Sequence, residues 1–293
     1  MVPLGFQPLH STAPLRAQLL TQVSENSDCM VANSSVQFKS ARELHELECS
    51  TAAPLPSGCS TLDELIGGGF LPGCVTEISG EAGCGKSQIC MQFVATTIAR
   101  GANVVCIETE RGFSVKRVHQ MLGYHTNDVG AAMHRLLISS PTTMEQMMYL
   151  LTKLEGSPEQ LATTSAVVVD AIATFFRGCS SKEEFQEWRN VLTILFKIAL
   201  HHSIAVIYVN HVTAREDVTS GEWTTMPFLS SGFTRRPTIQ LWLERMRCGS
   251  EEKRQITVRK SPFCPSKTAN YSITDSGVSF VCGVSLHDTS TFI

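Results

Sequence analysis

The sequence predicts an α/β fold with a mainly parallel sheet, helices on both faces and an antiparallel extension towards the C-terminus. Continuous Val/Ile-rich runs, typical of strands buried on both faces, alternate with segments of helical period up to residue 210. A glycine-rich stretch with the pattern G-x-x-x-x-G-K-S joins the first such run to the first helix. Beyond residue 238 the helical period stops, and short β-branched runs follow one another.

The parallel part begins with the strand Val75–Ser79 and a helix over Lys86–Arg100, where Ile89, Phe93 and Ile98 recur at helical spacing. Runs rich in Val and Ile then mark strands, and the longer periodic segments between them mark helices. The order is strand Asn103–Glu108, helix Val115–Leu122, strand Arg135–Ser139, Met-rich helix Thr142–Leu154, strand Ala166–Asp170, helix Phe185–His201 and strand Ile204–Asn210. Four short strands are expected to extend the sheet in antiparallel fashion: Thr238–Arg245, Gln255–Lys260, Tyr271–Thr274 and Val278–Val281.

Three regions are expected along the chain. Residues 1–35 are rich in Ser, Thr, Gln and Pro without a sustained period, which predicts a flexible arm. Residues 36–56 combine a short strand, a helical turn and a proline-bounded linker, and residues 57–293 are expected to form the α/β domain. The arm has no acidic residue before Glu25, which leaves a mitochondrial transit peptide as the alternative to a disordered tail.

The composition excludes several classes of protein. A net charge of −3 argues against a uniformly basic nucleic-acid-binding surface, so any such contact must come from local basic patches. The 11 cysteines are odd in number and form no C-x-x-C pair, which favours reduced thiols in the nucleus or cytosol over disulfides or zinc. No apolar run is long enough to predict a membrane span.

The segment "GEAGCGKS" predicts a phosphate-binding loop, because it lies between an expected strand and an expected helix. Glycines allow backbone N–H groups to converge on phosphate oxygens at the helix N-terminus. Lys86 is expected to contact the β- and γ-phosphates of ATP, and the Ser87 hydroxyl to bind Mg²⁺. The expected cofactor-binding residues are Gly80, Glu81, Ala82, Gly83, Cys84, Gly85, Lys86, Ser87 and Gln88.

Carboxylates are expected beside this loop. Asp170 ends the buried strand "AVVVD", at the edge where open parallel sheets bind ligands, and is predicted to meet Mg²⁺ together with Ser87. Glu108 and Glu110 end the strand before it, and either is placed to orient the attacking water.

At this point the sequence resembles the RecA-like strand-exchange family, in its eukaryotic recombinase and paralogue branch, from about Phe38 to Val281. The resemblance rests on "LPSGCSTLDELIGGGFLPGCVTEISGEAGCGKSQICMQF", "CIETERGFSVKRV", "VVVDAIATFFR" and "IAVIYVNHVT". It implies a RecA-like P-loop ATPase core and makes Glu110 the catalytic glutamate, with Lys86 at the phosphates. It also places Arg117 near the adenine.

The family strand that matches "IAVIYVNH" normally ends in asparagine-glutamine, and the glutamine senses the γ-phosphate. Here His211 takes that position, which puts the normal coupling of hydrolysis to DNA binding in doubt. "KSPFCPSK" resembles the segment that caps a neighbouring subunit's nucleotide. No helix-hairpin-helix domain is recognised, and the second DNA loop lacks its usual core, so the resemblance favours a paralogue, with a leaning to the X-ray-repair cross-complementing type.

The resemblance also predicts contacts with partners. "FKSARELHE" matches the polymerisation element, so Phe38 is expected to fill a pocket of an adjacent subunit, with Ala41 beside it; packing of Phe38 on its own domain is the alternative. The Met-rich helix could line a receiving pocket or simply fill the core. In the long segment after His211, Arg215, Trp223 and Phe228 are expected to contact single-stranded DNA, although nearby acidic residues leave a protein contact open.

The sequence therefore predicts a nuclear, ATP-binding recombinase paralogue with Mg²⁺ as cofactor, acting in homologous recombination and double-strand break repair. Its expected partners are other paralogues or the recombinase itself, and single-stranded DNA. A slow DNA-dependent ATPase, an ATP-stabilised adaptor that hardly hydrolyses, and a RecA-like ATPase outside recombination remain the alternatives.

Overall fold

The structure, a computed structural model, describes residues 39–43, 53–176, 181–216, 223–228, 237–248 and 251–280. The chain divides into two compact units, Met1–Cys49 and Ser50–Ile293. In the first unit, Ala41–Glu43 form a helical turn. Ser40 and Glu43 stabilise this turn as a capping box, because the Glu43 carboxylate accepts from the Ser40 backbone N–H at 2.6 Å and the Ser40 hydroxyl accepts from the Glu43 N–H at 3.2 Å. Ala41 thus begins a helical turn, and Phe38 lies outside the described residues.

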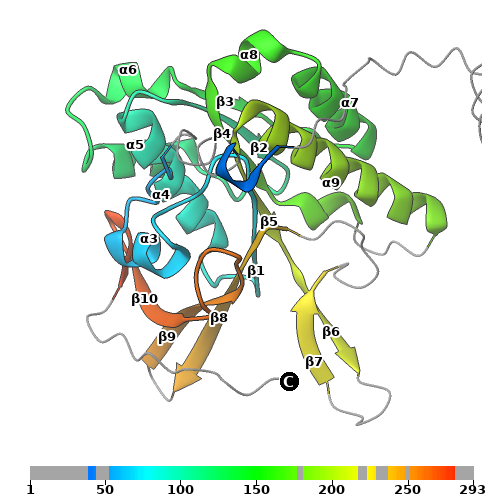
Figure 1. Ribbon diagram of the computed structural model, residues 1–293. Helices are drawn as coiled ribbons and strands as arrows, with labels where there is room; N and C mark the ends of the chain where they lie inside the picture. Colours follow the sequence, from blue (N-terminus) through cyan, green and yellow to red (C-terminus); the bar gives the residue numbers. More distant parts are fainter. Residues whose placement is uncertain are drawn as a thin grey trace, which may run out of the picture. The chain divides into compact units, whose positions relative to one another are not determined.

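The second unit contains a nine-stranded sheet with the order β11-β10-β9-β8-β1-β5-β4-β2-β3. Figure 1 shows helices on both sides of its central strands. The helices are α3 (Ser60–Ile66), α4 (Lys86–Ala99), α5 (Val115–Leu122), α6 (Val129–Met133), α7 (Met144–Glu155), α8 (Pro158–Ala162), the 3₁₀ turn η1 (Ile172–Phe176) and α9 (Lys182–His202). The strands are β1 (Val75–Gly80), β2 (Asn103–Glu108), β3 (Leu136–Ser139), β4 (Thr164–Asp170), β5 (Ala205–Asn210), β6 (Val212–Glu216), β7 (Trp223–Pro227), β8 (Ile239–Cys248), β9 (Glu251–Lys260), β10 (Thr268–Thr274) and β11 (Gly277–Phe280).

Each central strand sends alternate side chains into two separate cores, as a pleated strand must when helices cover both faces. On β2, Val104 and Cys106 join the core with α3, α4 and α5. Val105 and Ile107 join the core with α7, α8 and α9. This double burial explains why the strands read as continuous apolar runs in the sequence.

The predicted α/β fold with a mainly parallel sheet is confirmed, with one difference at its C-terminal extension. β8 pairs in parallel with β1, from Thr76 opposite Ile239 to Gly80 opposite Leu243. On its other side β8 is antiparallel to β9, and β10 and β11 continue the antiparallel order. The expected antiparallel extension is therefore present, but its first strand also belongs to the parallel sheet, because the direction of β8 depends on its pairing with β1 and not on its own residues.

The structure adds detail to two further segments, the one after His211 and the Met-rich helix. β6 and β7 pair as a two-stranded antiparallel hairpin where the sequence predicted only a long loop. In the Met-rich helix α7, Met147 is buried in the core, whereas Tyr149 is 70% exposed. Within the described part of the chain, no helix combines the length and apolarity that crossing a bilayer requires.

Candidate nucleotide-binding site

The glycine-rich loop connects β1 to α4 at the C-terminal edge of the parallel strands. Gly85 is the N-cap of α4 with a φ of 105°, a left-handed conformation that strongly favours glycine. A Cβ atom at Gly80 would lie 2.3 Å from the carbonyl oxygen of Leu243 on β8, so no side chain fits there. The glycines therefore allow the loop to curl around the N-terminus of α4, where backbone N–H groups attract anions.

Lys86 carries a buried positive charge at the start of α4, with 7% of the residue exposed. Its Nζ donates hydrogen bonds to the carbonyl oxygens of Gly80 at 2.6 Å and Glu81 at 2.8 Å. No ion pair neutralises Lys86 within the part of the chain that the structure describes. Because a buried charge without a counter-ion is costly, this arrangement favours an anionic ligand such as a phosphate.

The expected magnesium ligands lie together at the ends of β4 and α4. Ser87 on α4 lies beside the Asp170 carboxylate in the same cavity, and Asp170 is 4% exposed. Burial raises the pKa of Asp170 to about 6, with a smaller upward contribution from Glu110, against the downward effects of the Ser87 hydrogen bond and Lys86.

A second carboxylate, Glu108, lies opposite Asp170 in the pairing of β2 with β4. Glu108 Oε2 accepts from the Ser140 hydroxyl at 3.1 Å. Glu108 Oε1 and Asp170 Oδ2 are buried without a hydrogen-bond partner among the described residues. Two buried oxygens without donors fit a site for a hydrated divalent cation, so these residues are compatible with Mg²⁺.

Glu110 lies in the turn after β2, and the structure brings it to His211 at the end of β5. Glu110 Oε1 lies 2.8 Å from His211 Nε2 and accepts from the Thr174 hydroxyl at 3.1 Å. Their side chains are 26% and 21% exposed, so both remain accessible to solvent. The expected catalytic glutamate and the expected γ-phosphate sensor are thus direct neighbours, and His211 uses part of the hydrogen-bonding capacity that Glu110 would offer to a water.

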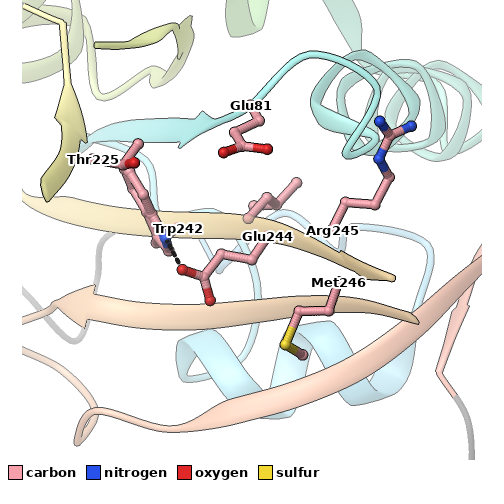
Figure 2. A pocket seen from close by; sticks show the side chains of 7 residues that line it. Glu81, Thr225, Trp242, Glu244, Arg245 and Met246 are labelled. Carbon is pink, nitrogen blue, oxygen red and sulfur yellow. Dashed lines mark hydrogen bonds between the residues drawn. The ribbon is translucent and has the colours of Figure 1, made fainter. Parts of the chain in front are cut away.

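These groups meet in one cavity of about 390 Å³. Its walls combine the loop, the carboxylates and the strand ends, and the residues are Ala82, Gly83, Gly85, Lys86, Ser87, Gln88, Glu110, Asp170, Val209, His211 and Ile273. The expected loop residues Gly80, Glu81 and Cys84 do not line it, and Cys84 is fully buried. Glu81 instead borders a second cavity of about 210 Å³, formed with Thr225 of β7 and residues 242–246 of β8 (Figure 2).

Arg117, expected near the adenine, is on α5 and does not line the 390 Å³ cavity. Its guanidinium donates to Gln88 Oε1 at 3.0 Å, to the Asp275 carbonyl at 2.8 Å and to the Thr274 carbonyl. Arg117 therefore ties α5 and the start of α4 to the turn between β10 and β11. A contact with the adenine stays a prediction.

The residues expected to contact DNA lie at different places on the β6–β7 hairpin. Arg215 pairs with Thr224, next to the pair of Glu216 with Trp223. Phe228 lies at the foot of the hairpin, where its backbone N–H donates to the His211 carbonyl at 2.7 Å and its side chain packs against the α7–α9 core. Phe228 thus supports the hairpin, and a contact of these three residues with DNA stays a prediction.

Several residues of the site could not be found from sequence motifs. Thr174, from η1, accepts or donates a hydrogen bond with Thr109 at 2.7 Å in addition to its bond with Glu110. Tyr271 on β10 donates its hydroxyl to the Cys84 carbonyl, which fixes the phosphate loop against the C-terminal strands. Ile273, two residues further, reaches the cavity wall. Their roles depend on contacts over long sequence distances, and no local pattern marks them.

Comparison with known proteins gives matches over most of this unit. The Rad51 family model matches residues 50–281. A DNA repair and recombination protein RadB from Halobacterium salinarum is 27% identical over 230 residues, covering 76% of this chain and 94% of that protein. The DNA repair protein RAD51 homolog 4 from Bos taurus is 30% identical over 248 residues, covering 80% and 74%.

A solved structure supports the same assignment. The crystal structure of the RadB recombinase superposes with a TM-score of 0.66 at 27% identity, covering 78% of this chain and 99% of that one. The leaning to the X-ray-repair cross-complementing type finds no support in these relatives, whereas the RecA-like recombinase assignment is confirmed. The chain belongs to the Rad51 family.

Proposed function

We propose that this chain is an ATP-binding recombinase paralogue, which helps a recombinase to assemble on single-stranded DNA within a paralogue complex during double-strand break repair. Relatives named as DNA repair and recombination proteins support a role in these processes. The family match also argues against an ATPase outside recombination. The observation that carries ATP binding is the buried charge of Lys86, which has no ion pair among the described residues, in one cavity with Asp170, whose Oδ2 has no hydrogen-bond partner among them.

The residues of the cavity would have three roles: binding phosphate, holding Mg²⁺ and orienting water. Lys86 would exchange its two hydrogen bonds with loop carbonyls for bonds to phosphate oxygens. Ser87 and Asp170 would hold Mg²⁺, directly or through water, and this ion supplies charge neutralisation at the β- and γ-phosphates. Glu110 would accept a hydrogen bond from the attacking water and so orient it.

A second candidate is an ATP-stabilised adaptor with little turnover. The contact of His211 with Glu110 at 2.8 Å favours it, because this contact occupies the oxygen that would otherwise face a water. Both candidates need ATP, and they differ only in the rate of hydrolysis.

The arm is proposed to bind a partner through Phe38 and Ala41, and the reciprocal surface would be the outer edge of β3, which pairs with no further strand among the described residues. β3 is the last strand of the sheet order, and Leu137 and Ile138 are 48% and 39% exposed. Exposed apolar side chains on an edge strand suit the addition of a further strand. We further propose that the chain acts in the nucleus; imaging of the tagged protein would test this, and accumulation in mitochondria would contradict it.

The test is to purify the chain with candidate paralogues and to measure ATP hydrolysis with and without single-stranded DNA. Stimulation by DNA would support the ATPase, whereas tight ATP binding with negligible turnover would support the adaptor. Lys86→Ala is the matched control, because it should remove ATP binding in either case. Failure of the wild-type complex to bind Mg-ATP would refute both candidates.

A further inference from the structure

Glu77 is a buried carboxylate on β1 that no part of the proposed nucleotide chemistry uses. It is 4% exposed, and it belongs to a strand whose residues are all buried. Glu77 Oε1 accepts from the Ser79 hydroxyl at 2.9 Å and from Asn210 Nδ2 at 2.6 Å, and Oε2 accepts from Gln240 Nε2 at 2.9 Å. Burying a carboxylate costs free energy of desolvation, and a buried carboxylate with several donors fixes the geometry of the groups around it. Core packing alone therefore does not explain Glu77.

The donors to Glu77 come from β1 itself and from both of its neighbours in the sheet. Asn210 ends β5, and Gln240 is the second residue of β8. Tyr208, also on β5, lies opposite Glu77 in the pairing of β1 with β5, and burial followed by the charge of Glu77 raises the pKa of Tyr208 well above its ordinary value. Glu77, in the middle of β1, thus links the C-terminal end of β5 to the N-terminal end of β8.

One of these contacts continues into the β6–β7 hairpin. The Asn210 side-chain amide, besides binding Glu77, donates to the Phe228 carbonyl at 3.0 Å. The Phe228 N–H in turn donates to the carbonyl of His211, whose side chain meets Glu110. The Glu77 carboxylate therefore holds the foot of the hairpin, that is His211 and Phe228, through Asn210. Asn210 directly precedes His211, whose side chain contacts Glu110.

The hairpin has little other support on its β8 side. Figure 2 shows Thr225 of β7 above Trp242 of β8, and the space bordered by Glu81, Thr225 and β8 is the cavity of about 210 Å³. Among the described residues, close packing therefore does not fill this side of the hairpin. At its foot, the Asn210–Phe228 hydrogen bond and the packing of the Phe228 side chain against the α7–α9 core both hold it.

We infer that Glu77 is a positioning residue that, through Asn210 and Phe228, fixes the orientation of the β6–β7 hairpin relative to the nucleotide cavity. The functional consequence rests on the proposed function, because it assumes that this hairpin contacts single-stranded DNA. Glu77 lies three residues before Gly80, so β1 carries both the start of the phosphate loop and the carboxylate that contacts Asn210. Loss of Glu77 should loosen the hairpin without disturbing the groups that hold phosphate.

Hydrogen–deuterium exchange of the full-length chain tests the structural part without ATP or DNA. In Asn210→Ala, amides of peptides covering residues 212–228 should exchange about tenfold faster, because this change removes the hydrogen bond to the Phe228 carbonyl; in Glu77→Gln they should exchange faster by a smaller factor, because a neutral amide oxygen accepts more weakly from Asn210. Exchange in β4 and α9 should stay unchanged. Gln240→Met is the matched control: it also deprives Glu77 of one donor, but it leaves the Asn210–Phe228 contact intact and should not change exchange in the hairpin.

Two outcomes would overturn the inference: unchanged hairpin exchange in Asn210→Ala, or an equal increase in Gln240→Met. If Glu77→Gln fails to fold, the comparison of hairpin exchange in Asn210→Ala with that in Gln240→Met still tests the inference.

The functional experiment measures ATP turnover at increasing DNA concentrations. In Asn210→Ala the half-saturating DNA concentration should rise about tenfold while the Kd for Mg-ATP is unchanged, and a rise in the Kd for Mg-ATP alone would contradict a role through the hairpin. If DNA does not stimulate ATP turnover of the wild-type protein, the proposed DNA-dependent function is refuted. The exchange experiment would still test whether Glu77 positions the hairpin.

Discussion

Asp170 should destabilise the nucleotide-free protein at neutral pH, and Asp170→Asn should therefore stabilise it. Burial raises the pKa of Asp170 from 3.8 to about 6. In the unfolded chain the carboxyl ionises near its ordinary pKa, so the folded state binds more protons between pH 4 and 6, roughly, and stability falls as pH rises through that window. About two pKa units correspond to about 3 kcal/mol at pH 7.5. The variant removes this penalty, and we expect a gain of about 1–3 kcal/mol because the new amide must still find an acceptor.

Urea unfolding in EDTA, with linear extrapolation, measures this free energy. The gain should shrink to about half at pH 5, where the folded protein already holds Asp170 protonated. Asp275→Asn, at an exposed carboxylate in the turn between β10 and β11, is the control and should change stability by less than about 0.5 kcal/mol. Added Mg-ATP should stabilise the wild type but much less the Asp170 variant, because the amide is a poorer ligand for Mg²⁺. A loss of stability in nucleotide-free Asp170→Asn at pH 7.5 would show that the carboxylate has a structural role, and the reasoning would fail.

Four other substitutions test separate parts of the site. Lys86→Ala should weaken Mg-ATP binding by at least about a hundredfold in calorimetry, since charged hydrogen bonds contribute about 1.5–3 kcal/mol each; unchanged affinity in a folded variant would remove Lys86 from the site. Glu110→Gln should keep ATP affinity within about threefold and lower any turnover by about 10²–10⁴-fold; if turnover persists, Glu110 is not the base. His211→Gln should raise DNA-stimulated turnover, because it removes the imidazole that meets Glu110, and an equal or lower rate would show that His211 does not restrain it. Phe38→Glu should weaken partner binding in a pull-down by about thirty- to thousandfold, as loss of a 2–4 kcal/mol anchor implies, with an unchanged Tm; a lower Tm with the complex preserved would place Phe38 in the core.

The sequence by itself determined which strands are buried on both faces. It also determined the phosphate-binding loop between the first of these strands, β1, and the helix α4. Continuous Val/Ile runs must pair with neighbours on both sides, and the glycine-lysine-serine pattern is informative because its strand and helix flank it directly. Asp170 was recognisable because it ends a buried strand, and parallel strands end at one edge of the sheet. His211 was recognisable only through the family resemblance, in which it replaces a glutamine after the next strand.

Only the tertiary structure decided which distant residues complete the site. β8 turned out parallel to β1, and this pairing brings Gln240 to Glu77 across 163 positions of sequence. Tyr271 meets Cys84 across 187 positions, and the contact of Glu110 with His211 spans 101. Periodicity and turn chemistry act over a few residues, whereas the order of strands is set by the free energy of burying all their apolar faces at once. For that reason the sequence shows the groups that carry the chemistry, and the fold decides which buried polar residues hold them in place.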